Sequence, residues 1–390
     1  MNLSAQTLFL SSLLYLVVLF VVAYAAEKRW LPPALARHPL VYVFSLGVYA
    51  TTWSFYGSVG FAQSNGFLFL AVYLGLTLAF ILTPILMSPI LRLVREYQLT
   101  SVADLFAFRF RSQTAGILVT VFTLAGTLPY ISLQIRAVTE SAQVLTQSVA
   151  PEYLSLGFCV LIILFAVLFG TRQISPREKH EGLVVAIAFE SLIKLLALLM
   201  VAVFALFGIF GGIDGLQDWL ATHPEALEKM TTQAREGPWV SILILAFAAA
   251  FLLPRQFHML FTENISPHAL SRAAWGFPLF LLALNLAIPI VLWAGIKTDL
   301  GMPPDYFVIG IAQQSQSALF TVFVFLGGVS AASAMIIVST LALAGMTVNH
   351  LILPATGTPS TRVSLYRWLL WGRRTIIAVL VFAGYAFFRT

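Results

Sequence analysis

The stretch GLVVAIAFESLIKLLALLMVAVFALF, residues 182–207, decides the fold. It has the length and apolar composition of a helix that crosses a bilayer, yet it contains Glu190 and Lys194. Counted from Gly182 at about 1.5 Å per residue, Glu190 lies roughly 12 Å and Lys194 roughly 18 Å into a hydrocarbon layer about 30 Å thick. Charges at that depth are costly, so both side chains are expected to face protein or water.

The spacing of these two charges allows them to neutralise each other. They are four residues apart with Glu190 on the N-terminal side, which favours an ion pair on one helix face. Two interpretations stay open. The pair either fixes helix packing only, or it marks a pathway for a solute or an ion.

The high share of hydrophobic residues predicts a membrane protein. Hydrophobic residues make up 59% and charged residues 10% of 390 residues, and the mean hydropathy is +0.91. This predicts an all-α, polytopic protein in a lipid bilayer. Residues 8–26 are expected to form a retained first helix, because they are long enough to span and the N-terminus lacks the charged leader and cleavage site of a signal peptide. The net charge of +6 does not indicate a nucleic-acid partner, since no soluble segment holds a basic cluster interleaved with aromatics.

Apolar stretches of spanning length predict ten transmembrane segments. They cover residues 8–26, 40–62, 67–90, 115–135, 154–170, 182–207, 239–262, 276–296, 318–348 and 371–388. Several contain residues that disturb helices at depth, namely Gly47, Gly57, Gly60, Pro129, Pro254 and Pro289. Breaks at such residues free backbone groups for binding ions and solutes. Residues 211–238 predict a solvated lid with a short surface helix.

Basic residues gather in alternate loops, which predicts the orientation. The set assigned to the cytoplasm is Lys28, Arg29, Arg37, Arg92, Arg95, Arg109, Arg111, Arg172, Arg177, Lys179, Arg255, Arg272, Arg362, Arg367, Arg373 and Arg374. The opposite side holds Arg136, Lys229, Arg235, Lys297 and Arg389. By the positive-inside rule, the N-terminus is expected outside.

The sequence shows no enzyme motif. His180, His258, His268 and His350 fall in or beside loops without metal-ligand spacing, and there is no phosphate loop or nucleophile elbow. We therefore predict no catalytic residues, no metal site and no cofactor other than a coupling sodium ion or proton.

Four segments resemble the sodium/solute symporter family. They are SLGVYATTWSFYGSVGFA at 45–62, TSVADLFAFRFR at 100–111, LPYISLQ at 128–134 and LPRQFHMLFTEN at 253–264. Together with FGTR at 169–172 and AIAFESLIKLLA at 186–197, they are most similar to the symporter-like membrane domain of bacterial hybrid sensor histidine kinases. The resemblance implies a location in the bacterial inner membrane and a cytoplasmic kinase region in cis.

The resemblance also implies a LeuT-type fold, in which two inverted five-helix repeats enclose a site at the midplane. Residues 1–38 would form an extra N-terminal helix and cytoplasmic loop. Residues 39–238 would form the first repeat with an extracytoplasmic loop, and residues 239–390 an incomplete second repeat. The last core helix is expected to follow Thr390, so the chain is predicted to be a fragment.

The family's sodium site maps onto the backbone carbonyls of Gly47 and Ala50. Its ninth-span hydroxyls fall at Ala334 and Met335, which are poor ligands for a hard cation. A shift of alignment by one turn would use Ser330 and Ser333 instead. The sixth-span pattern appears as Glu190, Ser191 and Lys194. An ammonium near this site predicts weakened or absent sodium coupling, with Glu190 as a proton carrier.

The expected activity is binding, with or without transport, of a small amino-acid-like solute as the input of a sensor kinase. The substrate-binding candidates are Tyr49, Thr51, Trp53, Ser54, Tyr73, Gln134 and Lys194. Their aromatic rings and single polar groups suit a zwitterion or an imidazole. The alternative is a stand-alone ion-coupled secondary symporter.

Overall fold

The computed structural model describes residues 3–146, 151–170, 179–356 and 365–389, and every regular element in them is helical. The α-helices are α1 (Ala5–Glu27), α2 (Pro33–Ala36), α3 (Pro39–Ser45), α4 (Ser58–Asn65), α5 (Leu70–Ile81), α6 (Met87–Glu96), α7 (Val102–Phe110), α8 (Gln113–Thr146), α9 (Pro151–Gly170), α10 (Glu181–Phe204), α11 (Ile213–Thr222), α12 (Pro224–Glu236), α13 (Trp239–Leu252), α14 (Pro254–Phe257), α15 (Pro267–Lys297), α16 (Phe307–Gln314), α17 (Ala318–Thr347), α18 (Leu353–Thr356) and α19 (Leu365–Arg389). Short 3₁₀ or π turns join them: η1 (Leu46–Tyr49), η2 (Trp53–Gly57), η3 (Gly66–Phe69), η4 (Ala205–Ile209), η5 (His258–Thr262), η6 (Pro304–Tyr306) and η7 (Val348–Ile352).

Each of the ten predicted segments falls on helices, with interruptions near Ala50, after Ile81 and at Leu253. Within the described residues, seven helices are long and apolar enough to cross a membrane, one further pair is bent by 46°, and two shorter apolar helices cover Pro39–Tyr49 and Tyr153–Leu168. The predicted segment 67–90 is divided, because α5 ends at Ile81 and a turn containing Pro84 separates it from α6.

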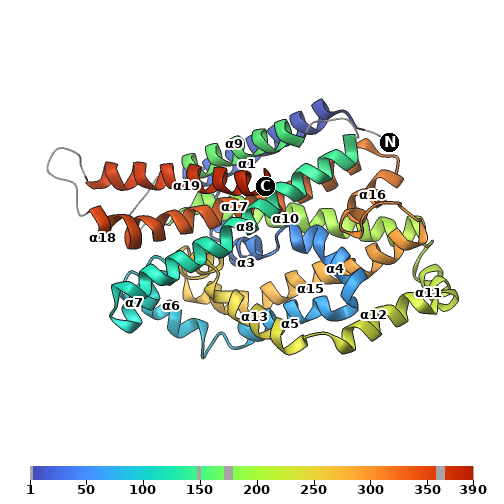
Figure 1. Ribbon diagram of the computed structural model, residues 1–390, viewed down its shortest axis with the longest axis horizontal. Helices are drawn as coiled ribbons and strands as arrows, with labels where there is room; N and C mark the ends of the chain where they lie inside the picture. Colours follow the sequence, from blue (N-terminus) through green and yellow to red (C-terminus); the bar gives the residue numbers. More distant parts are fainter. Residues whose placement is uncertain (1–2, 147–150, 171–178, 357–364, 390) are drawn as a thin grey trace.

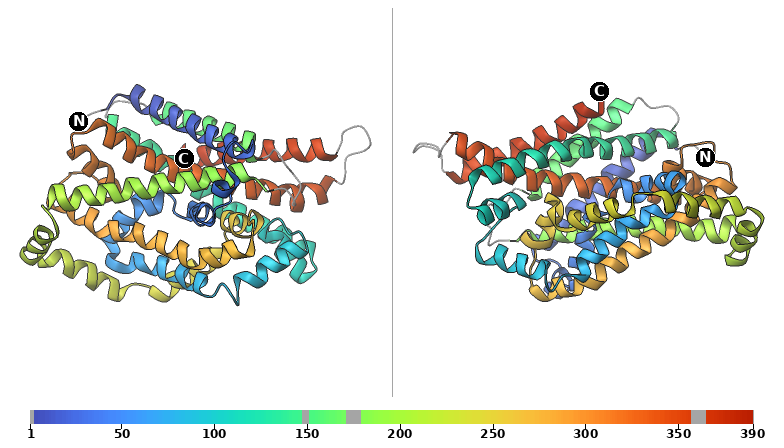
Figure 2. Two further views of the ribbon diagram at one scale, coloured as in Figure 1. Left: turned by 180° about the vertical axis from the view of Figure 1, so that it is seen from behind. Right: turned by 60° about the horizontal axis from the view of Figure 1, so that its bottom comes forward.

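Helix α17 forms the centre of the bundle. Of its most apolar stretch 83% is buried, against 28% for α1, and it packs on α8, α9, α10 and α19. Figure 1 shows α1, α9 and α19 on one side of α17 and α5, α13 and α15 on the other, and Figure 2 shows the same grouping. A helix that is apolar on all faces is stable against either protein or lipid, and the burial of α17 places it against protein.

Two of the spanning segments are interrupted at depth. The second is broken between η1 and η2, where Ala50 has an extended backbone (φ −73°, ψ 95°). The seventh bends at Leu253, directly before Pro254. Gly47 lets the segment before the first break lie close to α10, because a Cβ there would lie 2.5 Å from Ser191 Oγ.

Polar contacts join α8 to η6 at the end of the bundle that carries α11 and α16 (Figure 1). Tyr306 of η6 donates a hydrogen bond to the carboxylate of Glu140 near the end of α8, and Arg136 Nε binds the same carboxylate at 2.6 Å. Burial and the neighbouring carboxylate of Glu140 raise the pKa of Tyr306, so its hydroxyl stays a donor. The predicted lid contains two helices, α11 and α12, rather than one.

The opposite end holds two polar clusters that join segments far apart in the chain. His350 Nε2 lies 2.7 Å from Asp104 Oδ1, linking η7 to α7. His180 Nδ1 and His258 Nε2 lie 2.8 and 3.2 Å from Glu263 Oε1. Burial by itself would raise the pKa of Glu263, but the two histidines hold it well below its usual range. The first contact fixes α7 relative to η7, and the second cluster fixes the start of α10 relative to η5.

Candidate functional site

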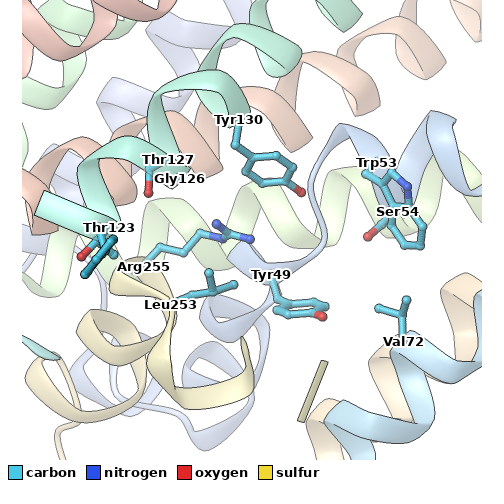
Figure 3. A pocket seen from close by; sticks show the side chains of 11 residues that line it. Tyr49, Trp53, Ser54, Val72, Thr123, Gly126, Thr127, Tyr130, Leu253 and Arg255 are labelled. Atoms are coloured by element: carbon cyan, nitrogen blue, oxygen red, sulfur yellow. The ribbon is translucent and has the colours of Figure 1, made fainter. Parts of the chain in front are cut away.

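A cavity of about 560 Å³ lies beside the break in the second spanning segment. This volume is within the range of small-molecule sites. Its lining combines aromatic rings, hydroxyls and one guanidinium (Figure 3). The lining residues are Tyr49, Trp53, Ser54, Val72, Phe122, Thr123, Gly126, Thr127, Tyr130, Leu253 and Arg255.

Side chains of α8 hold the break open. Gln134 Oε1 accepts hydrogen bonds from the backbone N–H of Thr52 at 3.1 Å and from its hydroxyl at 2.9 Å. The hydroxyls of Thr51 and Tyr130 lie 2.7 Å apart. These bonds satisfy polar groups that the interrupted helix leaves without partners, so the extended backbone is stable inside the protein.

The ammonium of Lys194 binds the backbone carbonyls at the break. Its Nζ donates to the carbonyl of Ala50 at 2.8 Å and to that of Gly47 at 3.2 Å. Glu190 accepts a hydrogen bond from Ser333 of α17. The predicted direct ion pair is wrong: in the described part of the chain, Glu190 and Lys194 do not form a salt bridge, because each bonds to a different neighbouring segment.

The structure brings most of the predicted substrate residues to the break. Tyr49, Trp53 and Ser54 line the cavity, while Thr51 and Gln134 support its wall. Tyr73 is buried nearby but is not a lining residue. The assignment of a substrate role to these residues stays a prediction.

Two of the predicted ion-coupling residues contact Lys194 directly. Gly47 and Ala50 supply carbonyls to it, and the close approach of Gly47 to Ser191 brings α10 against the break. Ser333 donates a hydrogen bond to Glu190, and the choice between Ser330 with Ser333 and Ala334 with Met335 as family counterparts stays a prediction. Ser330 donates to Gly327 of its own helix at 2.7 Å.

The assignment of Arg255 to a cytoplasmic loop is wrong. It follows Pro254 at the bend of the seventh segment, is 5% exposed and lines the cavity. A sequence signal was available, because Arg255 falls deep inside the predicted span 239–262. Tyr130, Thr123 and Thr127 of α8 were also missed, and nothing in an apolar helix distinguishes such residues from packing ones. Arg172, Arg177 and Arg362 of the predicted cytoplasmic set lie outside the described residues, as does the end of the FGTR motif.

Comparison with known proteins identifies the fold. No protein-family model matches the chain, and no curated protein matches it by sequence. By structure, the chain is similar to a substrate-bound, outward-open state of a Na⁺-coupled sialic acid symporter. The TM-score is 0.72 at 12% sequence identity, over 98% of this chain and 81% of the symporter chain.

These findings define a class. The chain is a multi-pass, all-helical membrane protein with a symporter-type fold of the LeuT kind, which confirms the predicted fold class. Its cavity lies between the two segments that are interrupted at depth, because both segments supply lining residues.

Proposed function

We propose that the chain binds a small amino-acid-like solute in the cavity and carries it between the two sides of the membrane. The observation that supports this best is the cavity itself, which opens beside an interrupted helix and presents two aromatic rings, Tyr49 and Trp53, with hydroxyls between them. Rings supply contact area and hydroxyls supply orientation, a combination that suits a small polar solute.

The ion coupling is proposed to differ from that of a sodium symporter. Lys194 donates to the two carbonyls that the resemblance assigns to the sodium site, so a fixed ammonium takes the place of a mobile cation. Glu190, within the same cluster and bonded to Ser333, is the candidate proton carrier. Transport would then depend on the proton gradient or on no ion.

Within a longer protein, we propose that this domain is the input module of a sensor histidine kinase, which responds to a solute-dependent shift between conformations. A stand-alone secondary symporter is the second candidate. The similarity to a symporter over 98% of the chain favours it.

The test uses the purified chain and the proteinogenic L-amino acids as probes. We expect at least one of them to raise the midpoint of thermal unfolding. Gly126→Leu is the control variant, because Gly126 lines the cavity and has open space around it. This variant should fold normally and lose the response. Stabilisation of both proteins to the same extent, or of neither, contradicts the proposal.

A second experiment separates the two candidates. The amino acid that binds is labelled and offered to proteoliposomes under a sodium gradient, a proton gradient or no gradient. Uptake driven by protons supports a symporter, whereas binding without uptake supports a sensor. Uptake that follows sodium alone refutes the proposed role of Lys194.

A further inference from the structure

Arg255 is a buried cation without a matching anion. Its side chain is 5% exposed, and no carboxylate among the described residues lies within salt-bridge range of it. Its Nε has no hydrogen-bond partner. Its Cζ lies 5.2 Å from the ring centroid of Tyr130, a contact that orients the guanidinium without neutralising it.

The charges around the break do not balance. Glu190 and Arg255 both act electrostatically on Lys194. Among the described residues, Glu190 is bonded to Ser333 and forms no salt bridge with Arg255, so the charge of Arg255 stays in excess. Because a guanidinium does not lose its proton in proteins, the excess cannot be relieved by titration. A buried charge that is neither paired nor fully hydrogen-bonded is costly, so the site lacks a negative group.

The cavity has room for that group. Figure 3 shows the guanidinium pointing into the space between Tyr49 and Tyr130. No acidic side chain is among the described residues that line the cavity, so nothing in the wall competes for the guanidinium. Its planar fork of donors matches a carboxylate in a bidentate arrangement.

We infer that Arg255 anchors the carboxylate of the solute, so that the substrate class is a small carboxylate whose body lies against Tyr49 and Trp53. This inference rests on the proposed function, which it narrows. It also explains why a charge is placed at the bend of the seventh segment. There, a shift between α13 and α14 would move the guanidinium together with the anion that it holds.

The test compares L-amino acids with their C-terminal amides and with the corresponding monocarboxylates that lack the amino group. Binding is measured by calorimetry on the parent protein, Arg255→Met, Arg255→Lys and the control Arg373→Met. Arg373 is a suitable control because its Nε is also buried without a partner, but it lies on α19 and does not line the cavity.

Each arm has an expected result. The parent should bind carboxylates at least about tenfold more tightly than amides, since a charge-assisted hydrogen bond is lost in the amide. Arg255→Met should lose this preference, Arg255→Lys should retain part of it, and Arg373→Met should keep it. Without solute, Arg255→Met should unfold at a higher temperature than the parent, because it removes an uncompensated charge.

The outcomes separate this inference from the proposed function. Solutes that bind the parent with equal affinity as acids and as amides leave the proposed function intact and overturn the role of Arg255. The same conclusion follows if Arg255→Met binds carboxylates as the parent does. If no solute of either kind binds and Arg255→Met does not stabilise the protein, both are wrong.

Discussion

Replacing Lys194 by Met tests the arrangement at the break most directly. Met has a similar length and no charge, so the variant removes the ammonium while it leaves the packing of α10 nearly unchanged. Two carbonyls, those of Gly47 and Ala50, lose their donor, and the fully buried Glu190 loses the nearby positive charge. We therefore expect a large loss of stability from one side chain.

The magnitude follows from these contacts. Each hydrogen bond from a charged donor contributes about 1.5–3 kcal/mol. Leaving the buried carboxylate of Glu190 without a nearby positive charge costs at most about 3–5 kcal/mol, the cost of breaking a directly bonded buried ion pair. The two figures describe overlapping effects and are not added. Because Lys194 is 1% exposed, solvent screening does not reduce them. Proton uptake by Glu190 would limit the loss to the lower end, so we expect about 3 kcal/mol.

The free energy of unfolding is measured by titration with sodium dodecyl sulfate in mixed micelles. Lys297→Met is the matched control, because Lys297 also donates to a carbonyl, that of Ile209 at 3.0 Å, but lies at the surface. It should change stability by less than about 1 kcal/mol. The double variant Glu190→Gln/Lys194→Met should recover part of the loss, since no isolated charge remains. A loss below about 1 kcal/mol for Lys194→Met, or no recovery in the double variant, refutes the reasoning.

Two further predictions concern a close contact and a polar cluster. Gly47→Ala should lower the free energy of unfolding by about 1–3 kcal/mol, because the new Cβ would lie 2.5 Å from Ser191 Oγ. Gly126→Ala is the control and should leave stability unchanged, because a Cβ there would have no atom within 4 Å. Equal effects of the two substitutions in the same unfolding titration would contradict the role of Gly47. Burial by itself would raise the pKa of Asp104, but hydrogen bonds from His350 and Thr100 outweigh it and lower this pKa. The folded-state value is below the unfolded one, so this carboxylate stabilises the protein above about pH 4 and the contribution is lost as the pH falls. Asp104→Asn should lose this part of the acid dependence of stability, and an unchanged profile would show that the cluster contributes nothing.

The positions of the helices follow from sequence because bilayer length and apolar composition constrain them strongly. Residues 182–207 and 318–348 are helical as predicted, and the break near Gly47 was indicated by its glycines. Helix ends were less accurate. Helix α5 ends at Ile81, where a local proline turn overrides an apolar stretch that continues to residue 90.

The partners of the charged residues could not be derived in the same way. The spacing of Glu190 and Lys194 shows that they share a helix face. It does not show that the ammonium of Lys194 binds the carbonyls of Ala50 and Gly47, which lie 144 and 147 residues away in the chain, instead of Glu190. Arg255 illustrates the opposite error. Its depth in an apolar span was visible in the sequence, and the loop assignment ignored it. Tertiary packing decides which side chains of α8 face the cavity, and sequence periodicity alone does not reveal it.

The ammonium of Lys194 is attached to the chain, and this changes how the break responds to the surroundings. A cation that binds from solution stabilises one conformation to an extent that grows with its concentration. A tethered cation is present at a fixed effective concentration that no dilution alters. The conformational equilibrium of this domain should therefore be insensitive to the salt in its medium. The same amount of solute would then give the same response at low and at high cation concentration in the medium.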